Sequence, residues 1–317
     1  MVEKQFKKGD VIFRQGDQGE SLFDIKEGTV CIVANYGDDN EQKLAELKKD
    51  QFFGEMAVIE AYPRSATAVA CDDVTVCEIS SGEISEYFKS QPDKIIAIMK
   101  HLGDRIRDLS ADFGEVNSTI QELGLGKDAS SGSLLDKIKK FAKVYSSSKN
   151  VADIKSFESL KKIEGTAHSG GYSKDVASFS KGAIIFKEGE IGDCMYDIHT
   201  GRIGIYSAYG TPDEKCLTVL EMNKFFGEMG MIEDTKRSAT AVVLDDETTL
   251  ETISANDLKE LFEKNPPKVE MILAHMSYRL RKLTNEYMRA CKIVSEVSDA
   301  QGQVSDAVKN YQPSFYD

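Results

Sequence analysis

The chain has 317 residues, of which 41% are hydrophobic, and it carries a formal net charge of −13. This length is sufficient for two domains, each with a core of its own. The negative charge argues against nucleic acid as a partner, since that binding depends largely on neutralising phosphates with lysine and arginine. No apolar run approaches the roughly 18–20 residues that span a bilayer. The N-terminal residues lack the apolar core of a signal peptide, so we expect a cytoplasmic protein without a membrane partner.

The six cysteines show no CxxC motif and no framework spacing. Cys31, Cys71 and Cys77 lie in strand-like runs, where a free cysteine behaves as a small hydrophobic residue. We therefore interpret the cysteines as thiols in a reducing compartment.

The chain begins with short strand-like runs separated by glycine and aspartate turns. The first is expected at 6–14, and two more follow at 21–25 and 29–33. A further strand is expected at 74–79, followed by Ser80 as a helix N-cap with a glutamate at the capping-box position. Short strands with such turns are typical of a sandwich or jelly roll.

The stretch FGEMAVIEAYPRSATAV, at 53–69, combines a glycine turn with a glutamate and an arginine. Gly54 lets the backbone approach a ligand closely. The amides of Met56 and Ala57 are expected to begin a helical turn that points unpaired N–H groups at an anion. Arg64 offers a planar fork of donors that matches phosphate oxygens, with the Ser65 hydroxyl and amide beside it.

Glu55, nine residues before the arginine, is an acceptor when ionised, so it suits sugar hydroxyls and would repel a phosphate. The motif therefore indicates a ligand with hydroxyls at one end and a phosphate at the other. The alternative is an internal Glu–Arg ion pair without a ligand. The same motif recurs as FGEMGMIEDTKRSATAV, and its candidate ligand-binding residues are Gly227, Glu228, Met229, Gly230, Arg237 and Ser238. A constant offset of 173 residues relates the two copies, so the chain is a duplicated domain.

Both motifs resemble the phosphate-binding cassette of cyclic-nucleotide-binding domains, as found in protein kinase A regulatory subunits and catabolite activator proteins. The resemblance implies that Glu55 and Glu228 bind a ribose 2′-hydroxyl and that the two arginines bind the cyclic phosphate. It further implies help from the amides of Ala57 and Ser65, or of Gly230 and Ser238. One cyclic AMP or cyclic GMP per domain is then expected, with no other cofactor. The serine after each arginine leaves the purine undecided.

A helical period follows each motif, with apolar residues in steps of three and four over 95–123 and again over 269–297. Nine apolar positions in register predict two long helices, each with a coiled-coil seam, which we call the seam helices. The alternative is a core helix that packs only on its own barrel. The resemblance places Asp112 and Phe113, and likewise Glu286 and Tyr287, where this family caps or reads the base. A solvated helix face is the other interpretation of the two carboxylates.

The predicted fold is mainly β with helices: two β-jelly-roll domains, each followed by a long C-terminal helix. The expected divisions are a first domain at 1–125, a linker with short helices at 126–174 and a second domain at 175–317. In the linker, 134–142 has amphipathic spacing and 151–161 is another candidate helix. The tail is expected to extend the last helix until Pro313.

No HxH spacing, Cys–His cluster or GxSxG elbow occurs, so we expect neither a metal site nor an enzyme. No helix-turn-helix or pseudosubstrate stretch is found either, and we expect a sensor that regulates an unidentified protein effector. The alternatives are a ligand-free interaction scaffold or a stand-alone regulatory subunit of a kinase. The matched seams predict an intrachain pseudo-dimer, with a homodimer as the competing arrangement.

Overall fold

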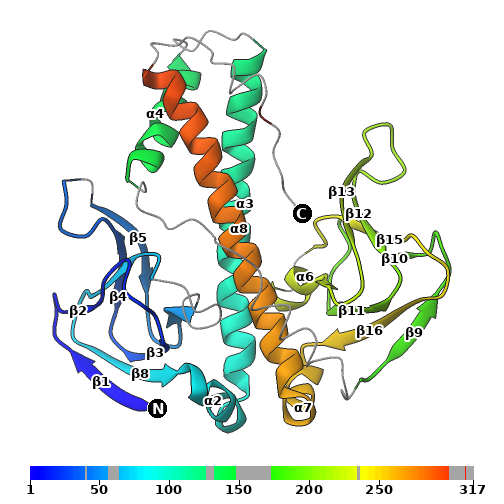
Figure 1. Ribbon diagram of the computed structural model, residues 1–317, viewed down its shortest axis with the longest axis horizontal. Helices are drawn as coiled ribbons and strands as arrows, with labels where there is room; N and C mark the ends of the chain where they lie inside the picture. Colours follow the sequence, from blue (N-terminus) through cyan, green and yellow to red (C-terminus); the bar gives the residue numbers. More distant parts are fainter. Residues whose placement is uncertain are drawn as a thin grey trace. The chain divides into compact units, whose positions relative to one another are not determined.

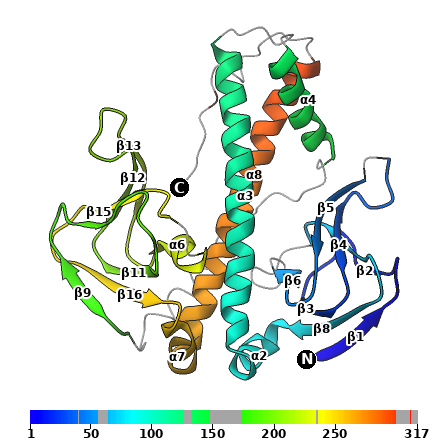
Figure 2. The same cartoon turned by 180° about the vertical axis from the view of Figure 1, so that it is seen from behind.

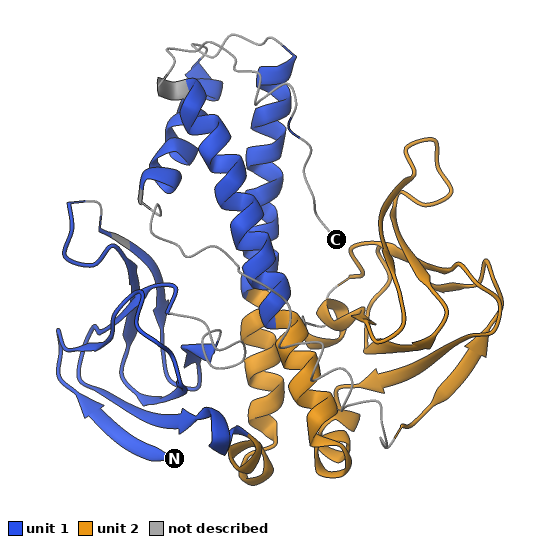
Figure 3. Ribbon diagram, in the orientation of Figure 1, with its two compact units in different colours: residues 1–84, 105–155, 277–314 blue, residues 85–104, 156–276, 315–317 orange. Residues whose placement is uncertain are grey.

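The computed structural model describes residues 1–39, 41–55, 64–125, 132–147, 173–233, 236–299 and residue 311. This part of the chain contains 16 strands and six α-helices (Figure 1). It divides into two compact units, each built from three stretches of sequence (Figure 3). Unit 1 comprises 1–84, 105–155 and 277–314, and unit 2 comprises 85–104, 156–276 and 315–317. Within the described ranges, no helix has the length and apolar character that crossing a membrane requires.

The first half forms a barrel of two four-stranded sheets with strand orders β1-β8-β3-β6 and β2-β7-β4-β5. Its strands are β1 (Val2–Phe6), β2 (Val11–Phe13), β3 (Ser21–Glu27), β4 (Val30–Ala34), β5 (Gln42–Leu47), β6 (Phe52–Phe53), β7 (Thr67–Ala70) and β8 (Val74–Ser80). All pairings are antiparallel. The single strand expected at 6–14 is wrong, because a turn with Gly9 at φ 92° separates β1 from β2.

The second half repeats this barrel with strand orders β14-β11-β16-β9 and β10-β15-β12-β13. Its strands are β9 (Val176–Phe179), β10 (Ile184–Phe186), β11 (Cys194–Thr200), β12 (Ile203–Ser207), β13 (Lys215–Leu220), β14 (Phe225–Phe226), β15 (Thr240–Val243) and β16 (Thr248–Ser254). Because both sheets pair strands that are distant in sequence, the expected pair of jelly rolls is confirmed.

Aromatic residues fill equivalent places in the two barrel cores. In the first barrel, Phe23 stacks on Phe53 with ring centroids 4.9 Å apart. In the second, Tyr196 stacks on Phe226 at 5.2 Å. Residues alternate between the two faces of a strand, so β3 and β11 direct these rings into the barrel core, while their neighbours lie on the opposite face of the sheet and are also buried. The stacked rings thus hold β3 against β6 and β11 against β14, the strands that lead into the two motifs.

Helices follow each barrel. After β8 come a 3₁₀ turn (Ser81–Glu83), α2 (Ile84–Ser90) and α3 (Asp93–Gly124); after β16 come α7 (Asp257–Lys264) and α8 (Pro266–Asp299), while α6 (Glu228–Glu233) belongs to the second motif. The Ser80 amide donates to Glu83 Oε2 at 3.1 Å, which confirms the expected capping box. Both seam helices are confirmed, and all nine apolar positions of the second seam are buried.

Each unit takes one segment of α3 and one of α8, which lie side by side (Figures 1 and 2). In unit 1, the linker helix α4 (Gly132–Ser147) covers the end of this pair. Lys137 contacts Glu122 at 3.4 Å and Lys140 contacts Glu115 at 2.6 Å, so α4 runs antiparallel to α3. The other helix expected in the linker, at 151–161, lies outside the described residues, as does the tail beyond 299 apart from residue 311.

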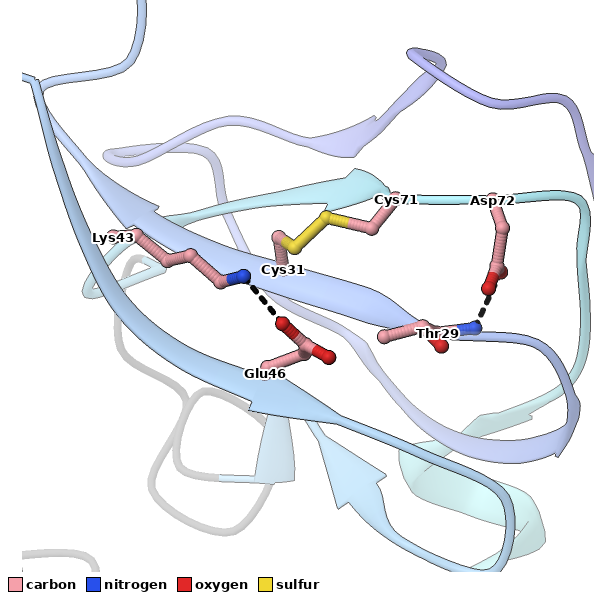
Figure 4. Close-up of a disulfide and its surroundings, with 6 residues drawn as sticks. All are labelled: Thr29, Cys31, Lys43, Glu46, Cys71 and Asp72. Atoms are coloured by element: carbon pink, nitrogen blue, oxygen red, sulfur yellow. Dashed lines mark hydrogen bonds and ion pairs between the residues drawn. A yellow bond between two sulfur atoms is a disulfide. The ribbon is translucent and has the colours of Figure 1, made fainter.

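The expectation that Cys31 and Cys71 are thiols is wrong. The two are joined as a disulfide between β4 and the residue that follows β7, with Cα atoms 5.8 Å apart (Figure 4). These strands are neighbours in one sheet, and Cys31 lies in register with Val69. The pairing escaped the sequence because it depends on strand register, which cysteine spacing does not reveal. The remaining four cysteines, all in described parts of the chain, are thiols.

Candidate functional site

The backbone of each motif arginine is held by the turn between the second and third strands of its barrel. In the second barrel the partners are the residues that the offset of 173 predicts. The bonds are Arg64 N to Asp17 O (2.8 Å), Gly16 N to Arg64 O (2.9 Å), Arg237 N to Glu190 O (2.7 Å) and Gly189 N to Arg237 O (2.8 Å). Both arginines are thereby fixed at the start of a central strand, β7 or β15.

The Arg64 side chain is buried, with 6% of its surface exposed. Its Nη1 donates to Gly54 O at 2.7 Å and its Nη2 donates to Ser21 O at 2.6 Å. The guanidinium lies over the Phe13 ring at 4.2 Å from the ring centre. The Nε–H group is buried without a hydrogen-bond partner. Burial lowers the pKa of Arg64, and the nearby Glu55 carboxylate opposes that shift.

Arg237 repeats this arrangement in the second barrel. Its Nη1 donates to Gly227 O at 2.5 Å and its Nη2 donates to Cys194 O at 2.7 Å, while Nε again has no partner. The Phe186 ring lies 4.2 Å below the guanidinium. One difference is chemical: Cys194 stands where the first barrel has Ser21, and its Sγ lies 3.7 Å from Arg237 Nη2.

Glycines make room for each guanidinium. Gly54 has φ 77°, and a Cβ there would lie 2.5 Å from Arg64 Nη1. A Cβ at Gly227, at Gly192 or at Gly230 would lie within 3 Å of the Arg237 side chain. Real Cβ atoms do not approach so closely, so a side chain at any of these positions would displace the guanidinium. The glycines thus make room for the arginine, and the close approach of a ligand at Gly54 stays a prediction.

Glu55 is almost fully buried and does not pair with Arg64. Its Oε1 accepts a hydrogen bond from Arg105 Nη1 at 2.7 Å. Arg105 lies on α3, and 43% of its side chain is exposed. Sequence reasoning missed this residue, although the helices repeat at an offset of 174, which makes Arg279 its counterpart. The recurrence of an arginine at this position in both helices was the signal that could have identified Arg105.

The remaining motif residues differ in how they are placed. Glu228 is buried at the first position of α6, where Met229 and Gly230 follow it in the first turn. Ser65 and Ser238 are exposed directly after the arginines. Met56 and Ala57 lie outside the described residues, so their predicted amide contacts stay predictions.

The four residues proposed to contact the base lie in helices of unit 1. Phe113 is fully buried on α3, eight residues after Arg105, which corresponds to about 12 Å along the helix axis. Tyr287 is buried against Phe141 of α4, with ring centroids 6.4 Å apart. Asp112 is half-exposed and lies 3.8 Å from Lys140, and Glu286 lies 3.9 Å from Arg289. Both rings are thus buried in helices of unit 1, and their predicted contact with the base stays a prediction.

A second group of buried charges lies in unit 2, on the paired strands β11 and β16. Lys268, in the first turn of α8, contacts Asp197 Oδ2 at 2.7 Å and also bonds to the Glu251 carboxylate. His199 Nε2 lies 3.1 Å from Glu251 Oε2 and 3.4 Å from Asp197 Oδ2. A metal ion could use these three ligands, but the Lys268 ammonium already supplies a cation to both carboxylates.

The model of the cyclic nucleotide-binding domain family matches residues 3–91 and 176–265. Among curated relatives, the cAMP-dependent protein kinase regulatory subunit of Debaryomyces hansenii is 27% identical over 77% of this chain and 41% of its own length. The cGMP-dependent protein kinase of Plasmodium berghei is 26% identical over 75% of this chain and 21% of its own. The chain therefore spans less than half the length of these two relatives.

Among solved structures, the catabolite activator protein of Thermus thermophilus is 24% identical over 41% of this chain and 58% of that one, at a TM-score of 0.32. The two regions that the family model matches are the two barrels with the turns and helices that follow them. Each region contains one complete motif with its glycine, glutamate and arginine. They make up more than half of the chain. The chain belongs to the cyclic nucleotide-binding domain family.

Proposed function

We propose that this chain is a non-enzymatic cytoplasmic sensor that binds one cyclic nucleotide, cyclic AMP or cyclic GMP, in each barrel and thereby regulates a separate protein. The observation that carries the proposal is the state of Arg64 and Arg237. Each guanidinium is held by two backbone carbonyls, yet its buried Nε–H has no partner. A buried donor without an acceptor is costly, and an anionic oxygen supplies one.

The two ends of the site suit different parts of a cyclic nucleotide. The arginine forks match the cyclic phosphate, whose charge would be repelled by the carboxylates. Glu55 and Glu228 are buried acceptors that suit the ribose 2′-hydroxyl. In the first site, Arg105 holds the Glu55 carboxylate from the helix side, so a ribose hydroxyl bound to Glu55 meets α3 as well. Ligand binding and helix position are thereby connected in unit 1.

We propose a protein kinase as the effector, because two matched relatives are a kinase regulatory subunit and a kinase that carries its own catalytic part, by their names. An interaction scaffold that keeps the fold without a ligand is the alternative. It gives no reason for two buried arginines with unpartnered donors, since a site without a ligand gains nothing from that cost.

Thermal unfolding in the presence of each nucleotide tests the proposal. A ligand at about 100 times its dissociation constant stabilises the domain that binds it by roughly 2.7 kcal/mol. We expect cyclic AMP or cyclic GMP to raise the unfolding temperature and titration calorimetry to find two sites per chain. The linear nucleotides 5′-AMP and 5′-GMP serve as controls. If neither cyclic nucleotide shifts the melt, the scaffold interpretation stands and the sensor is ruled out.

A further inference from the structure

The disulfide closes one corner of the first barrel that the second barrel closes without a covalent bond. At this corner the Cys71 amide donates to Thr29 O at 2.9 Å, and the Thr29 amide donates to Asp72 Oδ1 at 2.6 Å (Figure 4). Cys31 is the second residue of β4. It lies on the same face as Cys71 and packs with Val69. The Cα separation of 5.8 Å is ordinary for a disulfide, so the fold accommodates the bond without rearrangement.

The second barrel shows that the fold does not depend on this bond. At the offset of 173, Gly204 and Leu244 replace the two cysteines, yet β12 and β15 pair in the same register as β4 and β7. The equivalent corner is closed by the Leu244 amide, which donates to Arg202 O at 2.9 Å, and by a two-pronged ion pair between Arg202 and Asp245. The disulfide is therefore a property added to the first barrel alone.

The position of the bond relates it to the first nucleotide site. The two cysteines are 40 positions apart in the sequence, and the segment between them includes Gly54, Glu55 and Arg64. Cys71 directly follows β7, a central strand that begins three residues after Arg64 and is buried along its whole length. The disulfide thus fixes the far end of the strand that positions the arginine, and it limits how far the enclosed segment can spread.

We propose that Cys31 and Cys71 form a reversible thiol–disulfide pair that raises the nucleotide affinity of the first site and leaves the second unchanged; the inference rests on the proposed function. Cys71 is half-buried and Cys31 fully buried, so Cys71 is the sulfur that meets a small molecule first. Its thiolate attacks a small disulfide RSSR, which gives a mixed disulfide and releases one RS⁻. Cys31 then attacks the Cys71 sulfur and expels the second RS⁻. The two cysteine protons end on the two RSH products.

A redox titration of the full chain tests this pair directly. The protein is equilibrated with mixtures of reduced and oxidised dithiothreitol, its thiols are blocked in acid, and the Cys31–Cys71 disulfide is measured by peptide mass spectrometry. Since coupling is reciprocal, nucleotide must favour the oxidised form by the factor with which oxidation favours nucleotide. We expect a factor of about five or more, the lower end of usual coupling. For a two-electron couple this moves the midpoint by about 20 mV in the reducing direction.

Variants identify which site responds. Saturating cyclic nucleotide should still move the midpoint in Arg237→Ala, which leaves only the first site, and should not move it in Arg64→Ala. In the Arg237→Ala background, calorimetry should give about fivefold weaker binding after reduction. Cys77→Ser, which removes a thiol on β8 in the other sheet of the same barrel, should keep this difference. Cys31→Ala combined with Cys71→Ser should abolish it.

Two results overturn the inference while the proposed function stands. In the first, the affinity of each site for nucleotide is the same in the oxidised and the reduced protein. In the second, the shift of the redox midpoint persists in Arg64→Ala. A Cys31–Cys71 bond that fails to form at any dithiothreitol ratio also overturns it. Absence of nucleotide binding to both the oxidised and the reduced protein contradicts the proposed function as well, so the two failures are distinguishable.

Discussion

Arg64 and Arg237 have the same backbone bonds, the same two carbonyl acceptors and the same aromatic support. If they bind phosphate, Arg64→Ala should lower affinity at the first site by about 2–5 kcal/mol, because a buried phosphate is left unpaired. That is roughly 30-fold to several-thousand-fold. Arg64→Lys should recover part of this loss only, since an ammonium cannot form the planar fork.

Two-site titration calorimetry checks this, with Arg237→Ala as the matched control that should weaken only the second site. An Arg64→Ala protein that still binds two nucleotides with unchanged affinities would show that the phosphate lies elsewhere.

We expect His199 to make the stability of the second barrel depend on pH. Its hydrogen bonds to Asp197 and then to Glu251 raise its pKa to about 9. The unfolded value is about 6.5, so the protonated ring adds its full stability below pH 6.5 and loses it as the pH rises through 9. The contribution is at most about 3 kcal/mol, and the 23% exposure of the side chain reduces it. We expect the unfolding free energy of the second barrel to fall across this window.

The first barrel supplies the control substitution. Lys26 stands at the position of His199 and contacts Asp24 at 2.6 Å. His199→Lys should therefore keep a cation beside the two carboxylates up to about pH 10 and flatten the pH dependence. Denaturant unfolding at pH 6.5 and pH 9 measures both proteins. An equal loss of stability in wild type and His199→Lys would remove His199 as the cause.

At the scale of elements, local patterns identified most of the fold and part of the site. The motif at 53–69, the capping box after β8 and the seam period each depend on neighbours within a few residues, so all three could be found from the sequence. The Arg105–Glu55 bond, the Cys31–Cys71 disulfide and the Lys268 cluster join residues far apart in the chain. Their existence depends on strand register and helix rotation, which a single sequence does not specify.

Helix α4 shows which contacts hold a short element to its neighbours. Phe141 is fully buried against Tyr287, and its replacement by alanine should cost about 3–5 kcal/mol. Lys140 contacts Glu115 at 2.6 Å, but both side chains are exposed, so Lys140→Ala should cost no more than about 1 kcal/mol. Hydrogen exchange of the α4 amides should accelerate about a hundredfold or more in Phe141→Ala and less than about tenfold in Lys140→Ala. The reverse order would mean that charge, not packing, holds α4.

At the scale of the whole molecule, duplication gives each half a barrel and a long helix, and both helices contribute to both compact units. Unit 1 contains the second part of α3, which carries Arg105, together with the second part of α8. Helix α3 is continuous, so we expect that, if ligand at Glu55 shifts α3, the shift extends along the whole helix.

The predicted intrachain pairing of the seams has a direct test in unit 1. Leu109 of α3 and Leu283 of α8 are equivalent seam positions, the first half-buried and the second buried. Leu109→Cys combined with Leu283→Cys should crosslink within one chain on mild oxidation, and each single variant should not. The product is recognised by faster migration of a monomer on a denaturing gel, lost on reduction. If the seams pair between chains instead, the double variant should give a covalent dimer whose formation slows on dilution, with no fast-migrating monomer. If ligand binding to Glu55 breaks its bond to Arg105, four residues before Leu109, saturating cyclic nucleotide should also change the rate of the intrachain crosslink.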